Sequence, residues 1–182
     1  MSIKPGTHKL GPDCGTLTIT TGRAGAAAKA GHDLTISVDD WDGTLEIGED
    51  PSQSSLALNA DTDSLRVVDG KGGIKSLGDD DKKAIKKTID DEVLKRDKIQ
   101  FRSTSVQGND SGKLTVQGDL TLSGKTAPLS FDVFVGDNGS VRGSAVVKQT
   151  NWGMKPFSTM FGQLKVADEV TVSIENGSLP SS

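Results

Sequence analysis

Three consecutive β-strand patterns within residues 99–135 constrain the fold of this chain most. The second and third patterns alternate apolar with polar residues, and their apolar members are Leu114, Val116, Leu120 and Leu122, then Leu129, Phe131, Val133 and Val135. Successive side chains of a strand point to opposite faces, so each apolar set shares one face. Asn109-Asp110-Ser111-Gly112 is a turn signal between the first two patterns. The sequence therefore predicts an antiparallel meander with one apolar face and one polar face.

The same alternation recurs on both sides of the meander and predicts that the sheet extends along the chain. Its apolar members are Leu17 and Ile19; Leu34, Ile36 and Val38; Leu45 and Ile47; Leu56 and Leu58; Val141, Ala145 and Val147; Val170, Val172 and Ile174. Asn138-Gly139 indicates a tight hairpin, because both residues tolerate the positive φ of a two-residue turn. A long sheet of this kind removes its edges by closing. We therefore expect an all-β fold, an antiparallel β-barrel of about eight strands.

A different period within residues 79–94 predicts one surface α-helix. Ile85, Ile89 and Val93 recur every four residues and form a narrow apolar stripe. Asp79 and the two aspartates after it favour the helix start, where negative charge meets the positive end of the helix dipole. We expect the stripe to pack on the barrel or over its mouth.

The chain of 182 residues is long enough for one domain with a sizeable core. Residues 1–14 are polar and interrupted by Pro and Gly, which predicts a flexible lead-in. The barrel domain is expected to span residues 15–176, with a tail at residues 177–182. The Ala-rich segment 22–31 has two readings, either a short helix or a strand or bend of small residues.

Four segments resemble the YceI-like family: FRST at 101–104, VQGDLTLSGKT at 116–126, GHDL at 31–34 and QLKVADEV at 163–170. The resemblance covers about residues 15–176. It implies a lipocalin-like antiparallel barrel that binds polyisoprenoids or similar long lipids in its interior. Relatives usually carry an Arg-Asp motif with aromatic residues before the central strands, and here Arg96-Asp97 is present without those aromatic residues.

Composition argues against several other function classes. The net charge is -4, and Lys and Arg are spread along the chain, so no basic patch predicts nucleic-acid binding. Two histidines and the single cysteine, Cys14, form no close-spaced ligand set, so we expect no metal and no other cofactor. Cys14 lacks a fixed neighbouring base, and no other catalytic constellation occurs, so no enzyme is expected.

No apolar run of the sequence reaches the length of a signal peptide or of a membrane span. We therefore expect no stable membrane insertion and a cytoplasmic location, although YceI-like proteins are often exported.

The resemblance and the strand pattern together predict a lipid site inside the barrel. The expected tail site lies along the strands that carry Leu34, Ile36, Phe101 and Phe131, and its entrance is formed by Trp152, Phe157 and Phe161. His32 or Lys148 is expected to hold a headgroup. The aromatic residues have a second reading, as a plug for one end of the barrel.

Two functions stay open at this point. With a hollow barrel, the protein is a carrier for an isoprenoid or another long-chain amphiphilic lipid. With a filled barrel, it is a non-enzymatic, stress-associated structural or interaction protein. About eight strands suit either reading, because such a barrel is just filled by side chains or holds one slender ligand.

Overall fold

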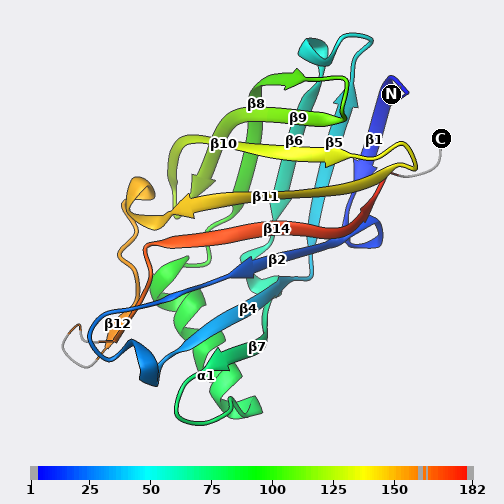
Figure 1. Ribbon diagram of the computed structural model, residues 1–182. Helices are drawn as coiled ribbons and strands as arrows, with labels where there is room; N and C mark the ends of the chain where they lie inside the picture. The colour runs from blue at the N-terminus through cyan, green and yellow to red at the C-terminus, as the bar shows by residue number, and fades with distance from the viewer. Residues whose placement is uncertain (1–3, 160–161, 163, 180–182) are drawn as a thin grey trace.

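The computed structural model describes residues 4–159, 162 and 164–179, and in it a long antiparallel sheet curls back on itself (Figure 1). Within these ranges the main sheet has eleven strands. In hydrogen-bonded order they are β1 (Gly6–Leu10), β5 (Trp41–Ile47), β6 (Ser55–Ala60), β8 (Ile99–Gly108), β9 (Lys113–Leu122), β10 (Lys125–Val135), β11 (Ser140–Lys148), β14 (Glu169–Ser178), β2 (Thr16–Thr20), β4 (His32–Val38) and β7 (Leu65–Gly72). A small second sheet has the order β12 (Ser158–Thr159), β13 (Leu164–Val166) and β3 (Arg23–Ala24).

Helical segments connect or cover these strands. The α-helix α1 (Asp79–Thr88) lies beside β7 and continues into a π-helical turn, η5 (Ile89–Val93) (Figure 1). Short 3-10 helices are η1 (Pro12–Cys14), η2 (Ala28–Ala30), η3 (Pro51–Gln53), η4 (Thr62–Ser64) and η6 (Gln149–Trp152). In the part of the chain that the structure describes, no helix is both long and apolar enough to cross a membrane.

The predicted meander is confirmed by β8, β9 and β10, which pair in chain order. Along β9, Leu114, Val116, Leu120 and Leu122 are buried, and the residues between them are more exposed except at Gly118. The apolar faces of these strands point to the inside of the curled sheet. The fold is therefore the antiparallel lipocalin-like β-barrel that the sequence predicted.

The strand count is larger than the predicted eight, because long strands bend and are interrupted. Strand β4 runs into β5 through Asp39 and Asp40, and β6 runs into β7 through η4. Backbone hydrogen bonds cross this bend, from Asp39 N to Ser64 O at 3.3 Å and from Asp61 N to Asp40 O at 3.0 Å. Strands β1 and β2 are likewise separated by η1. Each interruption therefore divides one long extended segment into two shorter strands.

The N-terminal segment contains a strand where the sequence predicted a flexible lead-in over residues 1–14. Strand β1 pairs with β5 in a register that places Gly6 opposite Ile47 and Leu10 opposite Gly43. The segment lacks the alternation that marks the other strands, so its order comes from backbone pairing with β5. At the other end, β14 extends through Ser178 into the predicted tail.

The predicted helix is confirmed, and it covers one side of the barrel. Its apolar stripe of Ile85, Ile89 and Val93 packs against the buried core. The side chain of Asp81 accepts the backbone N–H of Gly78 at 3.0 Å and so caps the first turn. The Ala-rich segment 22–31 combines both of the predicted alternatives, because it begins with the short strand β3 and ends with the short 3-10 helix η2.

Candidate ligand cavity

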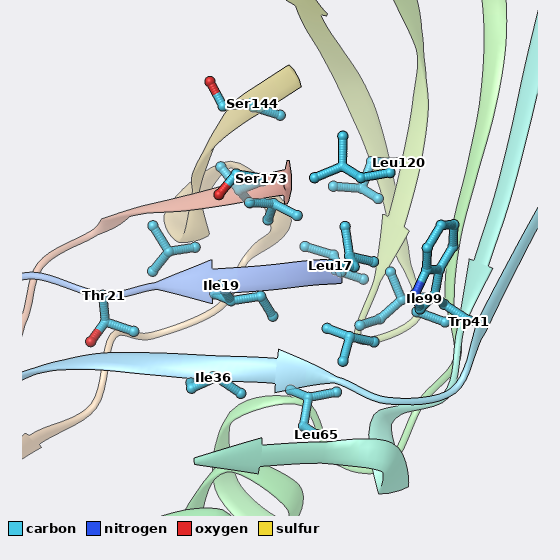
Figure 2. Close-up of a pocket in the computed structure, with 18 of the residues that line it drawn as sticks. Leu17, Ile19, Thr21, Ile36, Trp41, Leu65, Ile99, Leu120, Ser144 and Ser173 are labelled. Atoms are coloured by element: carbon cyan, nitrogen blue, oxygen red, sulfur yellow. The ribbon is translucent and has the colours of Figure 1, made fainter. Parts of the chain in front are cut away.

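A cavity of about 600 Å³ lies between the inner face of the sheet and the helical segment. Side chains from many strands line it, and Figure 2 shows Leu17, Ile19, Ile36, Trp41, Ile99 and Leu120 around it. The helical segment contributes Ala84, Ile85, Thr88, Ile89 and Val93 to the same lining. Pockets for small molecules and cofactors typically measure about 300–1,000 Å³, so the space is large enough for a ligand.

The four residues predicted to lie along the tail all line this cavity. Leu34, Ile36 and Phe101 are buried, and Phe131 is half-buried. The rings of Phe101 and Phe131 lie 5.2 Å apart, centroid to centroid, at an interplanar angle of 58°. This tilted arrangement is typical of aromatic pairs and gives the wall a fixed shape.

The aromatic residues predicted at the entrance lie in different places. Phe157 lines the cavity and is 37% exposed. Trp152 is not among the residues that line it; the indole is buried, and its Nε1–H donates to Leu120 O at 2.7 Å. That hydrogen bond makes Trp152 a support for β9. Phe161 lies outside the described residues.

The two predicted headgroup residues also lie apart. His32 lines the cavity, and its Nε2 is 2.7 Å from Lys75 O. Because a carbonyl oxygen only accepts, Nε2 carries the hydrogen of this bond. Lys148 is exposed on β11, opposite Glu169 in β14, and is not among the lining residues.

Trp41 is a lining residue that the sequence analysis did not predict. It begins β5, is buried, and its Nε1–H has no hydrogen-bond partner among the described residues. A signal for it was present, because Trp41 continues the two-residue spacing of Leu45 and Ile47. The indole of Trp41 therefore adds an aromatic side chain to the cavity lining.

Arg23 and Lys165 line the cavity as well, and neither was predicted. Arg23 Nε lies 3.1 Å from Asp33 Oδ1, and its Nη1 donates to Gly31 O at 3.2 Å. No sequence signal marks either residue, because Arg23 stands alone in an Ala-rich segment and Lys165 stands between Leu164 and Val166. Their neighbourhood arises from pairing between β3 and β13.

The carboxyl groups with shifted pKa values lie away from the cavity lining. The Arg66 guanidinium and the Ser37 hydroxyl lower the pKa of Asp39, and hydrogen bonds from Thr150 lower that of Asp168. Across residues 4–159, 162 and 164–179, no three His, Cys, Asp or Glu side chains are grouped as they would be to hold a metal ion. The cavity's chemistry is thus that of an apolar chamber with a few polar side chains.

Solved structures with the same fold come from several bacteria. BcnA of Burkholderia cenocepacia is 17% identical, with a TM-score of 0.61 over 87% of this chain and 93% of that one. A YceI protein of Campylobacter jejuni is 12% identical, with a TM-score of 0.57 over 81% and 85%. A polyisoprenoid-binding domain from Saccharophagus degradans, implicated in plant cell wall breakdown, is 10% identical, with a TM-score of 0.52 over 97% and 100%. At these identities the likeness concerns the fold alone.

Sequence comparison identifies the family more directly. No curated protein sequence matches the chain significantly. The YceI-like domain, in contrast, matches residues 16–176, nearly the whole of the described barrel. The chain therefore belongs to the YceI-like domain family.

Proposed function

We propose that this protein binds and carries an isoprenoid or another long-chain amphiphilic lipid inside the barrel. The observation that carries the proposal is the cavity of about 600 Å³, whose lining is made largely of apolar side chains. Each buried CH₂ contributes about 0.8 kcal/mol, so such a chamber favours a long hydrocarbon over a polar metabolite. The polyisoprenoid-binding domain of the same fold in Saccharophagus degradans supports this ligand class.

In the proposed complex the tail lies against Leu34, Ile36, Phe101 and Phe131, and Trp41 extends this wall. Phe157 borders the entrance, and Phe161 stays a prediction for the same region. His32 is the predicted headgroup residue that remains in the proposed site. Trp152 is not part of the proposed site, because its indole donates a hydrogen bond to Leu120 in β9. Lys148 is not part of it either, because its side chain lies on the exposed surface.

The second candidate function is the filled barrel of a structural or interaction protein. A cavity of about 600 Å³ argues against it, because side chains that filled the barrel would leave few voids larger than a water molecule. The family and the lining favour binding over catalysis. Native mass spectrometry of the purified protein separates the two functions. A co-purified lipid supports the carrier, whereas a clean apo mass across several preparations favours the second function.

The position of the two tryptophans gives a direct binding assay. The Trp152→Phe variant keeps Trp41 as its only tryptophan, and Trp41 lines the cavity. Farnesol, geranylgeraniol and solanesol titrated against its fluorescence should bind more tightly with length until the cavity is full. The Trp41→Phe variant, whose remaining indole faces β9, is the control and should respond weakly.

Failure of the whole alcohol series to bind, together with failure of fatty acids of matched length, would remove the carrier function. An affinity that does not depend on chain length would argue for surface adsorption. The cytoplasmic location expected from the sequence stays a prediction, and cell fractionation tests it.

A further inference from the structure

Trp41 places an unpaired hydrogen-bond donor at the cavity wall. Its indole is 4% exposed and lines the cavity, and its Nε1–H has no partner among the described residues. In Figure 2 the ring lies among the apolar side chains of Leu17, Ile99 and Leu120, and its nitrogen (blue) is on the side of Leu17 and Ile99. A buried donor without an acceptor destabilises a folded protein, so the unpaired N–H calls for a physical reason.

The second tryptophan shows the usual arrangement of a buried indole. Trp152 is 3% exposed, and its Nε1–H donates to Leu120 O at 2.7 Å. Trp152 is not among the lining residues. The two indoles are therefore similarly buried, and the one at the cavity is the one whose N–H no described residue accepts. This contrast indicates that the acceptor for Trp41 comes from the contents of the cavity.

The elements around Trp41 give its indole no acceptor within the part of the chain that the structure describes. Trp41 lies opposite Ala60 in β6, and Ala60 lies opposite Ile99 in β8. Both neighbouring side chains are apolar, and pairing engages the backbone carbonyls of these strands. Cys14 lines the same cavity, but its thiol donates to Lys9 O at 3.6 Å. The donor thus stands in an apolar part of the wall.

The donor lies at the opposite end of β4 from His32. Strand β4 begins at His32 and ends at Val38, which spans roughly 20 Å at about 3.3 Å per residue. Trp41 begins the next strand, β5, shortly after that end. When a headgroup is held near His32, an acceptor that reaches the indole therefore lies well along the buried tail.

We propose that Trp41 Nε1–H donates a hydrogen bond to an internal carbonyl group of the ligand, so that the cavity selects a long-chain lipid with a ketone or ester oxygen on its buried tail. A carbonyl oxygen accepts this bond and brings no hydrogen of its own that would need a partner in the apolar wall. A few placed polar groups fix the orientation of a ligand in an otherwise apolar site. This inference rests on the proposed lipid-binding function and narrows its ligand class.

The test compares ligands that share a headgroup and a chain length. Stearate and a series of oxostearates, each with one ketone at a different position from the middle of the chain to its end, are titrated by calorimetry against the full chain. At least one oxostearate should bind about 5-fold more tightly than stearate, because a net hydrogen bond contributes about that factor. In an apolar cavity without a donor, every ketone would instead weaken binding, since its desolvation would be uncompensated.

Nuclear magnetic resonance of the indole N–H groups reports on the proposed donor itself. The chain has two tryptophans and therefore two indole N–H signals. The Trp41 proton should move downfield when the preferred oxostearate binds and should stay nearly unchanged with stearate. Trp152 is the internal control, because its N–H is already bonded to Leu120 O and should barely move with either ligand.

Variants separate the N–H from the shape of the ring. Benzothienylalanine in place of Trp41 keeps a bicyclic ring of the same shape and lacks the N–H, so it should abolish the preference for the oxostearate and leave the affinity for stearate nearly unchanged. Trp41→Phe should also abolish the preference. Trp152→Phe is the matched control, because it removes an indole outside the cavity lining and should keep the preference.

The outcomes separate this proposal from the carrier function. Equal affinity for stearate and every oxostearate, or a preference that survives loss of the Trp41 N–H, overturns the carbonyl contact while the carrier function stands. A Trp41 signal that is already downfield without ligand and does not move on binding also overturns it, by showing that water satisfies the donor. An equal shift with stearate overturns it as well, because the carboxyl end would then reach Trp41. Failure of every amphiphile to bind overturns both.

Discussion

At the residue scale, the same strand pattern leads to different surroundings for individual side chains. Phe101 and Phe131 pack against each other on the inner face of the barrel wall, and both were predicted to face inward. Both line the cavity, but Phe101 is 3% exposed, whereas Phe131 is half-buried. A half-buried side chain loses fewer packing contacts on truncation than a buried one.

Alanine substitutions measure this difference. Phe101→Ala should lower the free energy of unfolding by about 3–5 kcal/mol, as is typical of buried aromatic residues. Phe131→Ala should cost about 1–2 kcal/mol, because this side chain is only half-buried. Urea denaturation gives both values. Phe134→Ala is the control. Phe134 is 38% exposed, and the Arg142 guanidinium lies 5.2 Å from the centre of its ring, so this substitution should cost about 0.5–1 kcal/mol. Equal losses at Phe101 and Phe134 would contradict the inward register.

At the element scale, the helical segment serves as a wall of the cavity and is held by ion pairs of unequal burial. Lys86 pairs with Asp90, and Lys87 pairs with Asp91, each at 2.5 Å and with the same spacing. Asp90 is 5% exposed, whereas Asp91 is exposed. Lys86 also donates to Thr62 O at 3.4 Å and so connects the helix to η4.

The two aspartates allow a matched comparison on one helical segment. Asp90→Ala should lower the free energy of unfolding by about 2–3 kcal/mol, because it leaves the Lys86 charge partly buried without its partner. Asp91→Ala should cost much less, since solvent screens an exposed pair. Thermal and urea unfolding give both losses, and a larger loss for Asp91→Ala would contradict the assigned burial.

The apolar stripe of the helix gives a second prediction at this scale. Ile89→Asp places a charge against the cavity lining and should destabilise the protein by about 3 kcal/mol, as an uncompensated buried charge does. Lys83→Asp puts the same side chain on the exposed face and should leave the melting temperature nearly unchanged. An unaltered melting temperature for Ile89→Asp would show that the stripe faces solvent.

At the scale of the whole molecule, hydrogen-bonded aspartates on the barrel exterior make stability depend on pH. The pKa of Asp132 is lowered by the Lys113 ammonium and the Thr115 hydroxyl, and Asp39 and Asp168 also have lowered pKa values. A group with a lowered folded-state pKa binds fewer protons in the folded state than in the unfolded state. Its stabilisation is present above the unfolded pKa of about 4 and is lost as the pH falls through the folded value.

We therefore expect the urea midpoint to fall on acidification below about pH 4, where these carboxylates take up protons. Denaturation curves at a series of pH values measure this. The Asp39→Asn variant, which cannot take up the proton, should start less stable at neutral pH and lose less on acidification. A midpoint that rises as the pH falls would contradict the assigned direction.

Local periodicity was enough to predict the strands and the helix of this protein. The two-residue alternation of Leu114, Val116 and Leu120 predicted the strands and their inward faces, and the four-residue spacing of Ile85 and Ile89 predicted the helix and its buried stripe. Both patterns need only one element to be recognised. The motif resemblance added the family and with it the candidate tail residues.

The bends, the volume of the interior and the set of residues that line it depend instead on long-range contacts of the folded chain. Strand β1 carries no alternation, and its order depends on its partner β5. The cavity exists because inward faces from distant strands leave about 600 Å³ between them, a quantity that no single strand specifies. Trp41 lines that space while Trp152 supports β9, although the sequence analysis had predicted Trp152, and not Trp41, for the ligand site. Arg23 and Val166 lie far apart along the chain and are opposite each other only because β3 pairs with β13, since long-range pairing, unlike periodicity, is a property of the folded chain.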